Sequence, residues 1–367
     1  MKKSLIALAV AGSFAAPAAF AATANVDVYG IMNIAVEDKS SRKVNNATES
    51  GNGLAVQDNY SRIGFKGSED LGGGLKALWQ IESQLSSGPS ATNNVDGVTG
   101  NSIATRNTFI GLSGGFGTVL AGRHDTPYKI ATLKYDIFGD TLADYNLGRL
   151  DGVSLIDGTH DHRSPDAIAY ISPNWSGFTV AAALVSTNQN GNLDADQQMD
   201  AYSLALMYAN GPLTVDAGYQ DVDQINSKAW KIGVGYTFGD LKLGFVYEDV
   251  TDRSTCVGTD TDAACAGSVN NVSAGKGSGL DRDSWLVNAA YNMGAITLKA
   301  LYGQADVDVR NAAGTGKTTQ DQDMWAIGAD YALSKRTTAY VVYGDADNDE
   351  ANGSDQSGWT IGMRHSF

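Results

Sequence analysis

The residues best suited to metal chemistry lie together in one segment of the chain. His160 and His162 form a His-x-His pair, with Asp157 and Asp161 beside them. Imidazole nitrogens and carboxylate oxygens are ligands that zinc takes in proteins. Because no further ligand follows at a fixed spacing, we expect a solvated loop here, with neither a metal site nor a bound cofactor.

Catalysis by a serine nucleophile would need a histidine and an acid beside it. The chain has four histidines, and we find none on an expected strand beside a plausible nucleophile; they are His124, His160, His162 and His365. We also expect no Gly-x-Ser-x-Gly nucleophile elbow, and therefore no enzyme.

The first residues have the pattern of an export signal. Two lysines follow the initial methionine, residues 5–16 are apolar, and residues 19–21 form a small-x-small cleavage site. This pattern is typical of a secretory signal and is too short for a membrane anchor. We expect residues 1–21 to be removed and residues 22–367 to form the exported domain.

Both cysteines fall in one long connection, residues 249–282. Export would place them in an oxidising compartment, where disulfides form and persist. We expect Cys256 and Cys265 to pair as a structural staple.

Charge argues against nucleic acid as a partner. Without the two lysines of the signal segment, 24 basic residues face 41 acidic ones, a net charge of −17. Phosphate binding needs clustered Lys and Arg, which this balance disfavours. The exported part also lacks a run of about 18 apolar residues, so a transmembrane helix is excluded on length.

Apolar and polar residues alternate along many segments. In one of them, Tyr202, Leu204 and Leu206 alternate with Ser203 and Ala205. Successive side chains of a strand point to opposite faces, so the apolar rows belong on one face. A soluble sandwich also alternates. Here, however, the runs have the length of about 9–11 residues that a tilted strand needs in a bilayer, and aromatic residues gather at their ends.

Counting these segments predicts a closed all-β fold, a 16-stranded antiparallel transmembrane β-barrel. The strands are expected at residues 24–37, 59–69, 75–84, 103–112, 117–123, 166–172, 177–187, 199–209, 212–221, 228–238, 240–249, 283–292, 295–304, 322–332, 337–345 and 357–367. Short turns alternate with long connections, as in outer-membrane barrels. A barrel of this size leaves an aqueous channel, and its closure satisfies every backbone group in lipid.

Six motifs in order resemble those of Gram-negative general diffusion porins, especially the β-proteobacterial and neisserial kind. Residues 61–72 resemble the second-strand signature of that family, and the other motifs are residues 111–117, 122–123, 170–173, 333–337 and 361–367. The resemblance implies passive diffusion of ions and small hydrophilic solutes across the outer membrane. It also implies a homotrimer in contact with outer-membrane lipid and lipopolysaccharide, with a long third loop folded into the lumen.

The resemblance places a basic cluster on the barrel wall at Arg62, Arg106 and Arg123. Alternation supports an inward direction for Arg62. It also supports one for Arg106, because Phe109 is taken to face lipid and Arg106 falls on the opposite face of the same strand. Arg123 shares the parity of the outward row, so its inward placement requires Gly122 to break the strand.

The facing acids are expected in the third loop, residues 124–163. Asp136 and Asp140 are the first candidates, with Asp144 behind them. Opposed basic and acidic walls filter ions by the sign of their charge. In one interpretation, Lys66 and Arg163 extend the basic side of the constriction. We favour the other, in which they are wall residues with no part in it.

Other barrel functions stay open. An outer-membrane phospholipase is the competing enzyme class, and a plugged structural barrel conflicts with the Gly-rich, charged inner row. A substrate-specific channel would use loop aromatics to guide its solute, although we favour their packing against the wall; these are Tyr128, Tyr135, Phe138 and Tyr145. The net charge favours cations and the wall arginines favour anions.

Overall fold

A computed structural model describes residues 25–43, 50–51, 53–85, 103–150, 152–158, 160–185, 201–223, 226–252, 280–310, 317–348 and 354–367. The expected signal peptide (residues 1–21) and the expected disulfide (Cys256 and Cys265) lie outside these residues.

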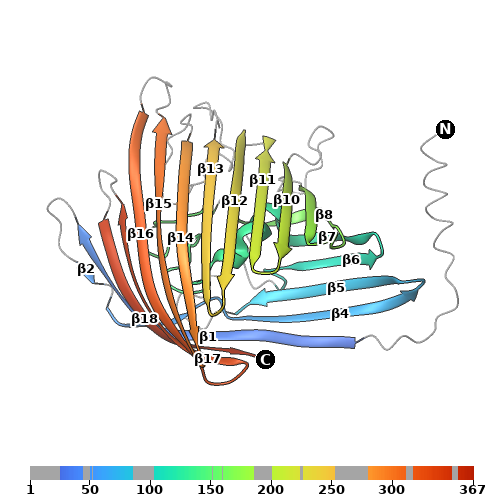
Figure 1. Cartoon of the computed structure of the whole chain (residues 1–367), viewed down its shortest axis with the longest axis horizontal. Helices are drawn as coiled ribbons and strands as arrows, with labels where there is room; N and C mark the ends of the chain where they lie inside the picture. Colours follow the sequence, from blue (N-terminus) through green and yellow to red (C-terminus); the bar gives the residue numbers. More distant parts are fainter. Residues whose placement is uncertain are drawn as a thin grey trace.

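The described chain is almost entirely β-structure (Figure 1). The strands are β1 (Asn25–Lys43), β2 (Ser50–Gly51), β3 (Ala55–Asp58), β4 (Arg62–Gly72), β5 (Leu75–Gln84), β6 (Thr108–Gly114), β7 (Gly117–Asp125), β8 (Arg163–Ile171), β9 (Phe178–Val185), β10 (Ala201–Asn210), β11 (Leu213–Val222), β12 (Ser227–Phe238), β13 (Leu241–Asp252), β14 (Leu280–Met293), β15 (Ile296–Arg310), β16 (Lys317–Ala332), β17 (Thr337–Asn348) and β18 (Ser354–Ser366). A short helix, α2 (Pro127–Thr132), and a 3-10 turn, η1 (Leu133–Tyr135), lie between β7 and β8.

The sheet closes on itself. From β4 to β18 each strand pairs antiparallel with the next in sequence, and β1 pairs with both β4 and β18. Because β2, β3 and β4 all pair with β1, they are pieces of one barrel strand, and the eighteen segments occupy sixteen positions. The predicted sixteen-stranded antiparallel barrel is confirmed.

Several strand ends differ from the prediction. The segment expected at 103–112 becomes a strand only at Thr108, because Ala104 has a φ of 79° and leaves the ladder. In the second half the strands are longer than expected. β15 reaches Arg310 and β16 begins at Lys317, so both extend into the predicted connection 305–321.

The two faces of the barrel have the predicted composition. On β10, Tyr202, Leu204 and Leu206 are exposed on the outside, whereas Ser203 and Ala205 are buried on the inside. Similar outward apolar side chains occur on other strands, including Phe245, Val287 and Ile327. In water this surface would be unfavourable, but lipid tails solvate it.

Aromatic rings pair near the ends of the outer rows, as on Tyr236–Phe238 and Trp285–Tyr302, with centroids 4.2 and 5.6 Å apart. Such rings suit the boundary between lipid tails and water. Among the described residues, no helix is long and apolar enough to cross a membrane.

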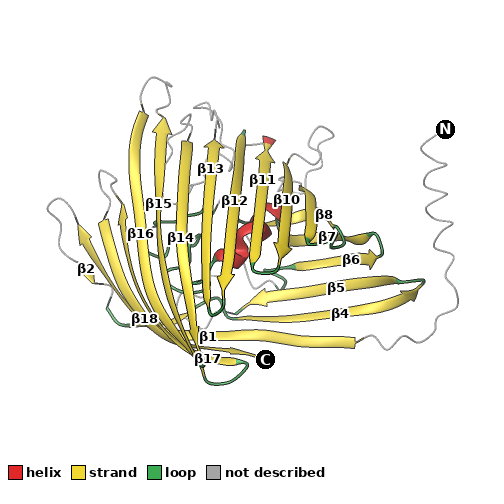
Figure 2. Cartoon of the chain, in the orientation of Figure 1, coloured by secondary structure: helices red, strands yellow, loops and turns green. Residues whose placement is uncertain are grey.

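The segment between β7 and β8, residues 126–162, folds into the barrel. Its helix α2 packs against the inner faces of β10, β11 and β12 (Figure 2). Glycine on the wall makes room for it, because a Cβ at Gly233 would overlap the ring of Tyr135. The long third loop expected at residues 124–163 is therefore present in the lumen, where it divides the interior.

Candidate functional site

Aromatic side chains attach the third loop to the barrel wall. Tyr128, Tyr135, Phe138 and Tyr145 are at most 4% exposed. The hydroxyl of Tyr128 donates to Glu248 Oε1 at 2.6 Å, and that of Tyr135 donates to Asp216. Since all four rings face protein, our expectation that they pack the loop against the wall is confirmed, and they do not line a solute path.

An apolar cluster holds the middle of the loop. Leu142, Leu150 and Leu155 are fully buried and pack in one cluster with wall residues such as Leu286 and Met324. Burial of this apolar surface is the main force that keeps the loop inside the barrel.

A buried ion pair holds the far end of the loop. Lys231 Nζ on β12 lies 2.5 Å from Asp161 Oδ1, both side chains are fully buried, and the ammonium also lies 4.1 Å from the Tyr128 ring centre. The backbone N–H of Asp157 donates to Glu248 Oε2 at 2.6 Å. Lys231 and Glu248 lie on the inner rows of β12 and β13, and alternation alone gives no sign of these partners.

The prediction of a solvated loop is wrong, because His160, Asp157 and Asp161 are buried and His162 is partly buried. His160 is 0% exposed, and its Nε2 lies 2.8 Å from Ser227 Oγ. Burial lowers the pKa of His160 to about 4, so the ring is neutral near neutral pH. Among the described residues, no group of three or more His, Cys, Asp or Glu side chains could hold a metal ion.

The loop meets the basic wall at one ion pair. Arg62 Nη1 on β4 donates to Asp140 Oδ2 at 2.8 Å, with both side chains about one fifth exposed (19% and 22%). The backbone carbonyl of Asp140 also accepts a hydrogen bond from Asn33 Nδ2 at 2.9 Å. This contact joins the loop tip to β1 and β4, and it brings two of the predicted site residues together.

The other two predicted acids do not contact the predicted arginines in this way. Asp144 supports the backbone of Asp140, because the Asp140 N–H donates to Asp144 Oδ2 at 2.9 Å. Asp140 itself has a φ of 58°. Burial raises the pKa of Asp144 to about 6. Asp136 accepts from the N–H of Phe138, and burial, then the nearby Asp144, raises its pKa well above the ordinary value.

Arg106 is paired with an acid that the sequence did not single out. Its Nε donates to Glu82 Oε1 at 2.7 Å, and Tyr29 OH donates to Glu82 Oε2 at 2.8 Å. The argument from Phe109 is wrong, because Phe109 faces inward and packs edge-on against His124, 5.3 Å between ring centres. Arg106 reaches Glu82 because it precedes the first ladder residue of β6, so parity does not apply to it.

Arg123 turns inward through a β-bulge. The pairing of β7 with β8 shifts between Gly122 and His124, and Gly122 has a φ of 135°. Such a bulge re-aims the side chains that follow it. Arg123 Nε then donates to the carbonyl of Thr105 at 3.0 Å, and the residue is buried. We expected Gly122 to break the strand. Instead, β7 continues through Gly122 to Asp125 and contains a bulge.

The two further basic candidates differ. Arg163 is buried and its Nη2 lies 3.0 Å from Asp125 Oδ1. Lys66 lies over the Tyr29 ring at 5.1 Å from its centre.

A Gly-x-Ser-x-Gly sequence does occur, at residues 111–115. In hydrolases this pattern forms a strand-to-helix turn that exposes the serine. Here it ends β6 and leads into the β6–β7 hairpin, where Ser113 Oγ accepts from Thr118 Oγ1 at 3.0 Å. Its setting is that of a hairpin.

Comparison with known proteins agrees with this architecture. The model of the family described as Gram-negative porin matches residues 5–365. Proteins described as major outer membrane protein P.IB are 31% identical in Neisseria lactamica and 30% identical in Neisseria meningitidis serogroup A, each over the whole of both chains.

Solved structures share the fold. An anion-selective porin from Comamonas acidovorans superposes with a TM-score of 0.68 at 22% identity, covering 94% of this chain and all of that one. OmpF of Salmonella typhi, in complex with daunomycin, gives 0.61 at 19% identity over 93% and 97%. With a barrel closed around an inserted, charge-bearing loop and a family match along nearly its whole length, the chain belongs to the Gram-negative porins of the outer membrane.

Proposed function

We propose that this passive channel for ions and small hydrophilic solutes has its constriction where Arg62 meets Asp140. The observation that carries the proposal is the 2.8 Å ion pair between the wall and the loop tip. Both side chains are partly exposed, so hydrated ions can reach them. The Lys231–Asp161 pair is fully buried and cannot act on a passing solute in this way.

The remaining predicted residues surround this pair in graded roles. Arg106 with Glu82 extends the charged wall beside it, and Arg123 lies behind them at Thr105. On the loop, Asp144 orients Asp140, while Asp136 lines a polar cavity that Asp140 also borders. Fixed charges of opposite sign across a narrow wet gap order water and select ions by charge.

A substrate-specific channel is the less favoured function, because the loop aromatics that would guide a solute are buried. The family match supports a channel and not an enzyme.

Reconstitution into planar bilayers tests the constriction. Wild-type protein should give discrete ohmic conductance steps, and a salt gradient should give a defined reversal potential. The double variant Arg62→Ala/Arg106→Ala should move that potential towards cation selectivity, because Asp140 and Glu82 then lose their partners. An unchanged reversal potential would remove both arginines from the filter, while bilayers that stay insulating would refute channel activity itself.

We further propose a homotrimer that assembles through β6 and β7. Their outer rows are aliphatic, with Ile110, Leu112, Val119 and Ala121 lining an apolar groove. Within β6 and β7 these rows carry no aromatic ring, unlike those of β12 or β14, and the exposed ring of Phe116 lies on the turn that joins the two strands. Protein is therefore a better partner than lipid for this face, whereas lipid and lipopolysaccharide suit the rest of the outer wall.

Cross-linking tests the trimer. In a Cys256→Ser/Cys265→Ser background, Ile110→Cys should give covalent dimers and trimers with a short bis-maleimide. The control Ile327→Cys, equally apolar and 53% exposed on β16, should stay monomeric. Equal cross-linking at both positions would contradict the proposed face.

We also propose that residues 1–21 are cleaved on export and that Cys256 pairs with Cys265. The positively charged and apolar pattern of the first residues supports the cleavage, and the exported location supports the disulfide. N-terminal sequencing of the outer-membrane protein and its intact mass before and after reduction test both.

A further inference from the structure

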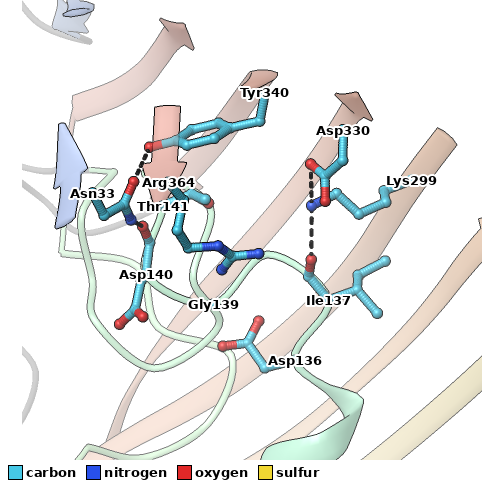
Figure 3. A pocket seen from close by; sticks show the side chains of 10 residues that line it. All are labelled: Asn33, Asp136, Ile137, Gly139, Asp140, Thr141, Lys299, Asp330, Tyr340 and Arg364. Carbon is cyan, nitrogen blue, oxygen red and sulfur yellow. Dashed lines mark hydrogen bonds and ion pairs between the residues drawn. The ribbon is translucent and has the colours of Figure 1, made fainter. Parts of the chain in front are cut away.

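A polar cavity of about 190 Å³ lies between the loop tip and the wall (Figure 3). The loop contributes Asp136, Ile137, Gly139, Asp140 and Thr141, and the wall contributes Asn33, Lys299, Asp330, Tyr340 and Arg364. At roughly 30 Å³ per water, the cavity holds several waters or one small organic solute. We call this cavity the niche.

The register of the strands places the niche near the short turns of the barrel. Lys299 is close to the start of β15, Asp330 to the end of β16 and Tyr340 to the start of β17. The short turns Met293–Ile296 and Ala332–Thr337 join these strands at that end. Since short turns face the periplasm in outer-membrane barrels, the niche opens on the periplasmic side of the loop.

Most polar groups of the niche already have partners. Lys299 Nζ donates to Asp330 Oδ1 at 2.9 Å and to the carbonyl of Ile137 at 3.0 Å. Tyr340 OH donates to Asn33 Oδ1 at 2.7 Å. These bonds fix the walls of the niche. They use two of the three N–H donors of the Lys299 ammonium, so one donor remains available.

Arg364 is different. Its side chain is only partly buried and has no hydrogen bond or ion pair to any described residue, although its guanidinium points from β18 towards the loop at Gly139 and Ile137 (Figure 3). On the opposite side lies Asp136, whose pKa is raised by burial and then by the nearby Asp144. The niche thus presents a guanidinium that forms no ion pair with any of the described carboxylates.

We propose that the niche is a binding site for a small monocarboxylate, whose two oxygens accept both N–H groups on one edge of Arg364. A planar guanidinium matches a carboxylate in this two-bond geometry. The remaining donor of Lys299, whose charge is paired with Asp330, lies in the same cavity and can give a further hydrogen bond. The niche adjoins the Arg62–Asp140 pair through Asp140, but Arg62 itself does not line it.

Binding can be measured without any channel activity. The full folded chain in detergent, at low ionic strength, is titrated into carbon-13-labelled acetate, and the acetate line width is followed by NMR. Wild-type protein should give saturable broadening. Arg364→Gln should abolish it, and Arg364→Lys should weaken it several-fold, because an ammonium keeps the charge but loses the two-bond geometry.

The control Lys335→Gln makes the same charge change on the exposed turn at this end of the barrel and should keep wild-type broadening. Equal broadening by wild type and Arg364→Gln would overturn the proposal, as would its loss in Lys335→Gln. Should Arg364→Gln fail to fold, an unchanged affinity in Arg364→Lys would overturn it instead. None of these results depends on conduction, so the site and the proposed constriction can fail separately.

Discussion

Removal of the Lys231 amine should release the far end of the third loop from the wall. Lys231→Met leaves the buried Asp161 carboxylate without its cation and removes the ammonium from the Tyr128 ring. Removing one partner of a buried ion pair costs about 3–5 kcal/mol, because the other charge stays desolvated. At about 1.36 kcal/mol per factor of ten, the ratio of docked to released loop falls by roughly 10²–10⁴.

Two assays report this release. In single-channel recordings, Lys231→Met should add open-channel noise and stepwise conductance changes as the loop moves in the lumen. In limited proteolysis, trypsin should cut at Arg149, whose side chain is 14% exposed in the docked loop and contacts Glu37. The far-ultraviolet β-sheet spectrum should not change, because the barrel hydrogen bonds do not involve the loop.

Matched variants separate the ion pair from the mere loss of a lysine. Lys228→Met, on the same strand, removes an ammonium that is 55% exposed in its pair with Asp221 and should behave as wild type. Lys231→Met/Asp161→Leu replaces both buried charges by apolar groups and should recover much of the docking. Wild-type noise and protease resistance in Lys231→Met would refute the proposed role of this pair.

Three further outcomes follow from the loop geometry. Asp140→Asn should leave Arg62 without its anion and move the reversal potential towards anions. Gly233→Leu should drive the Tyr135 ring from the wall and raise the conductance noise in the same recordings. Because the pKa of Asp144 is raised to about 6, its negative charge is lost as the pH falls through that value, which should shift selectivity towards anions. The raised pKa means that the docked loop binds the Asp144 proton more tightly than the released loop. Docking of the loop should therefore strengthen as the pH falls through about 6 and weaken as the pH rises through it. Asp144→Asn should flatten the selectivity step between about pH 7 and 5.

The barrel could be predicted because its outer surface imposes a rule at every second residue. Lipid accepts Leu204 or Phe245 and rejects a charge, so the outer row can be read from the sequence, and the inner row with it. Strand ends were less predictable. The start of β6 depends on the backbone of Ala104 leaving the ladder, which the alternation of side chains does not encode.

The site was predictable only in part, for a related reason. Inner-row charges such as Lys231, Glu248 and Glu82 all suit a wet lumen equally well, so the sequence pattern cannot separate a solvated charge from one covered by the loop. The path of the loop decides this. His160 shows the same effect, because it has the local sequence of a polar loop but lies buried against β11 and β12.

Pairing of charges also explains why the net charge is a poor guide to selectivity. Arg62 with Asp140 and Arg106 with Glu82 each form a dipole of oxygen and nitrogen less than 3 Å apart. The potential of such a dipole falls with distance faster than that of a single charge, and salt screens both. An ion in the lumen therefore senses the orientation of these pairs at close range. At longer range it senses charges such as Arg364, which has no partner among the described side chains. Selectivity should depend on a few such positions and much less on the excess of acids along the whole chain.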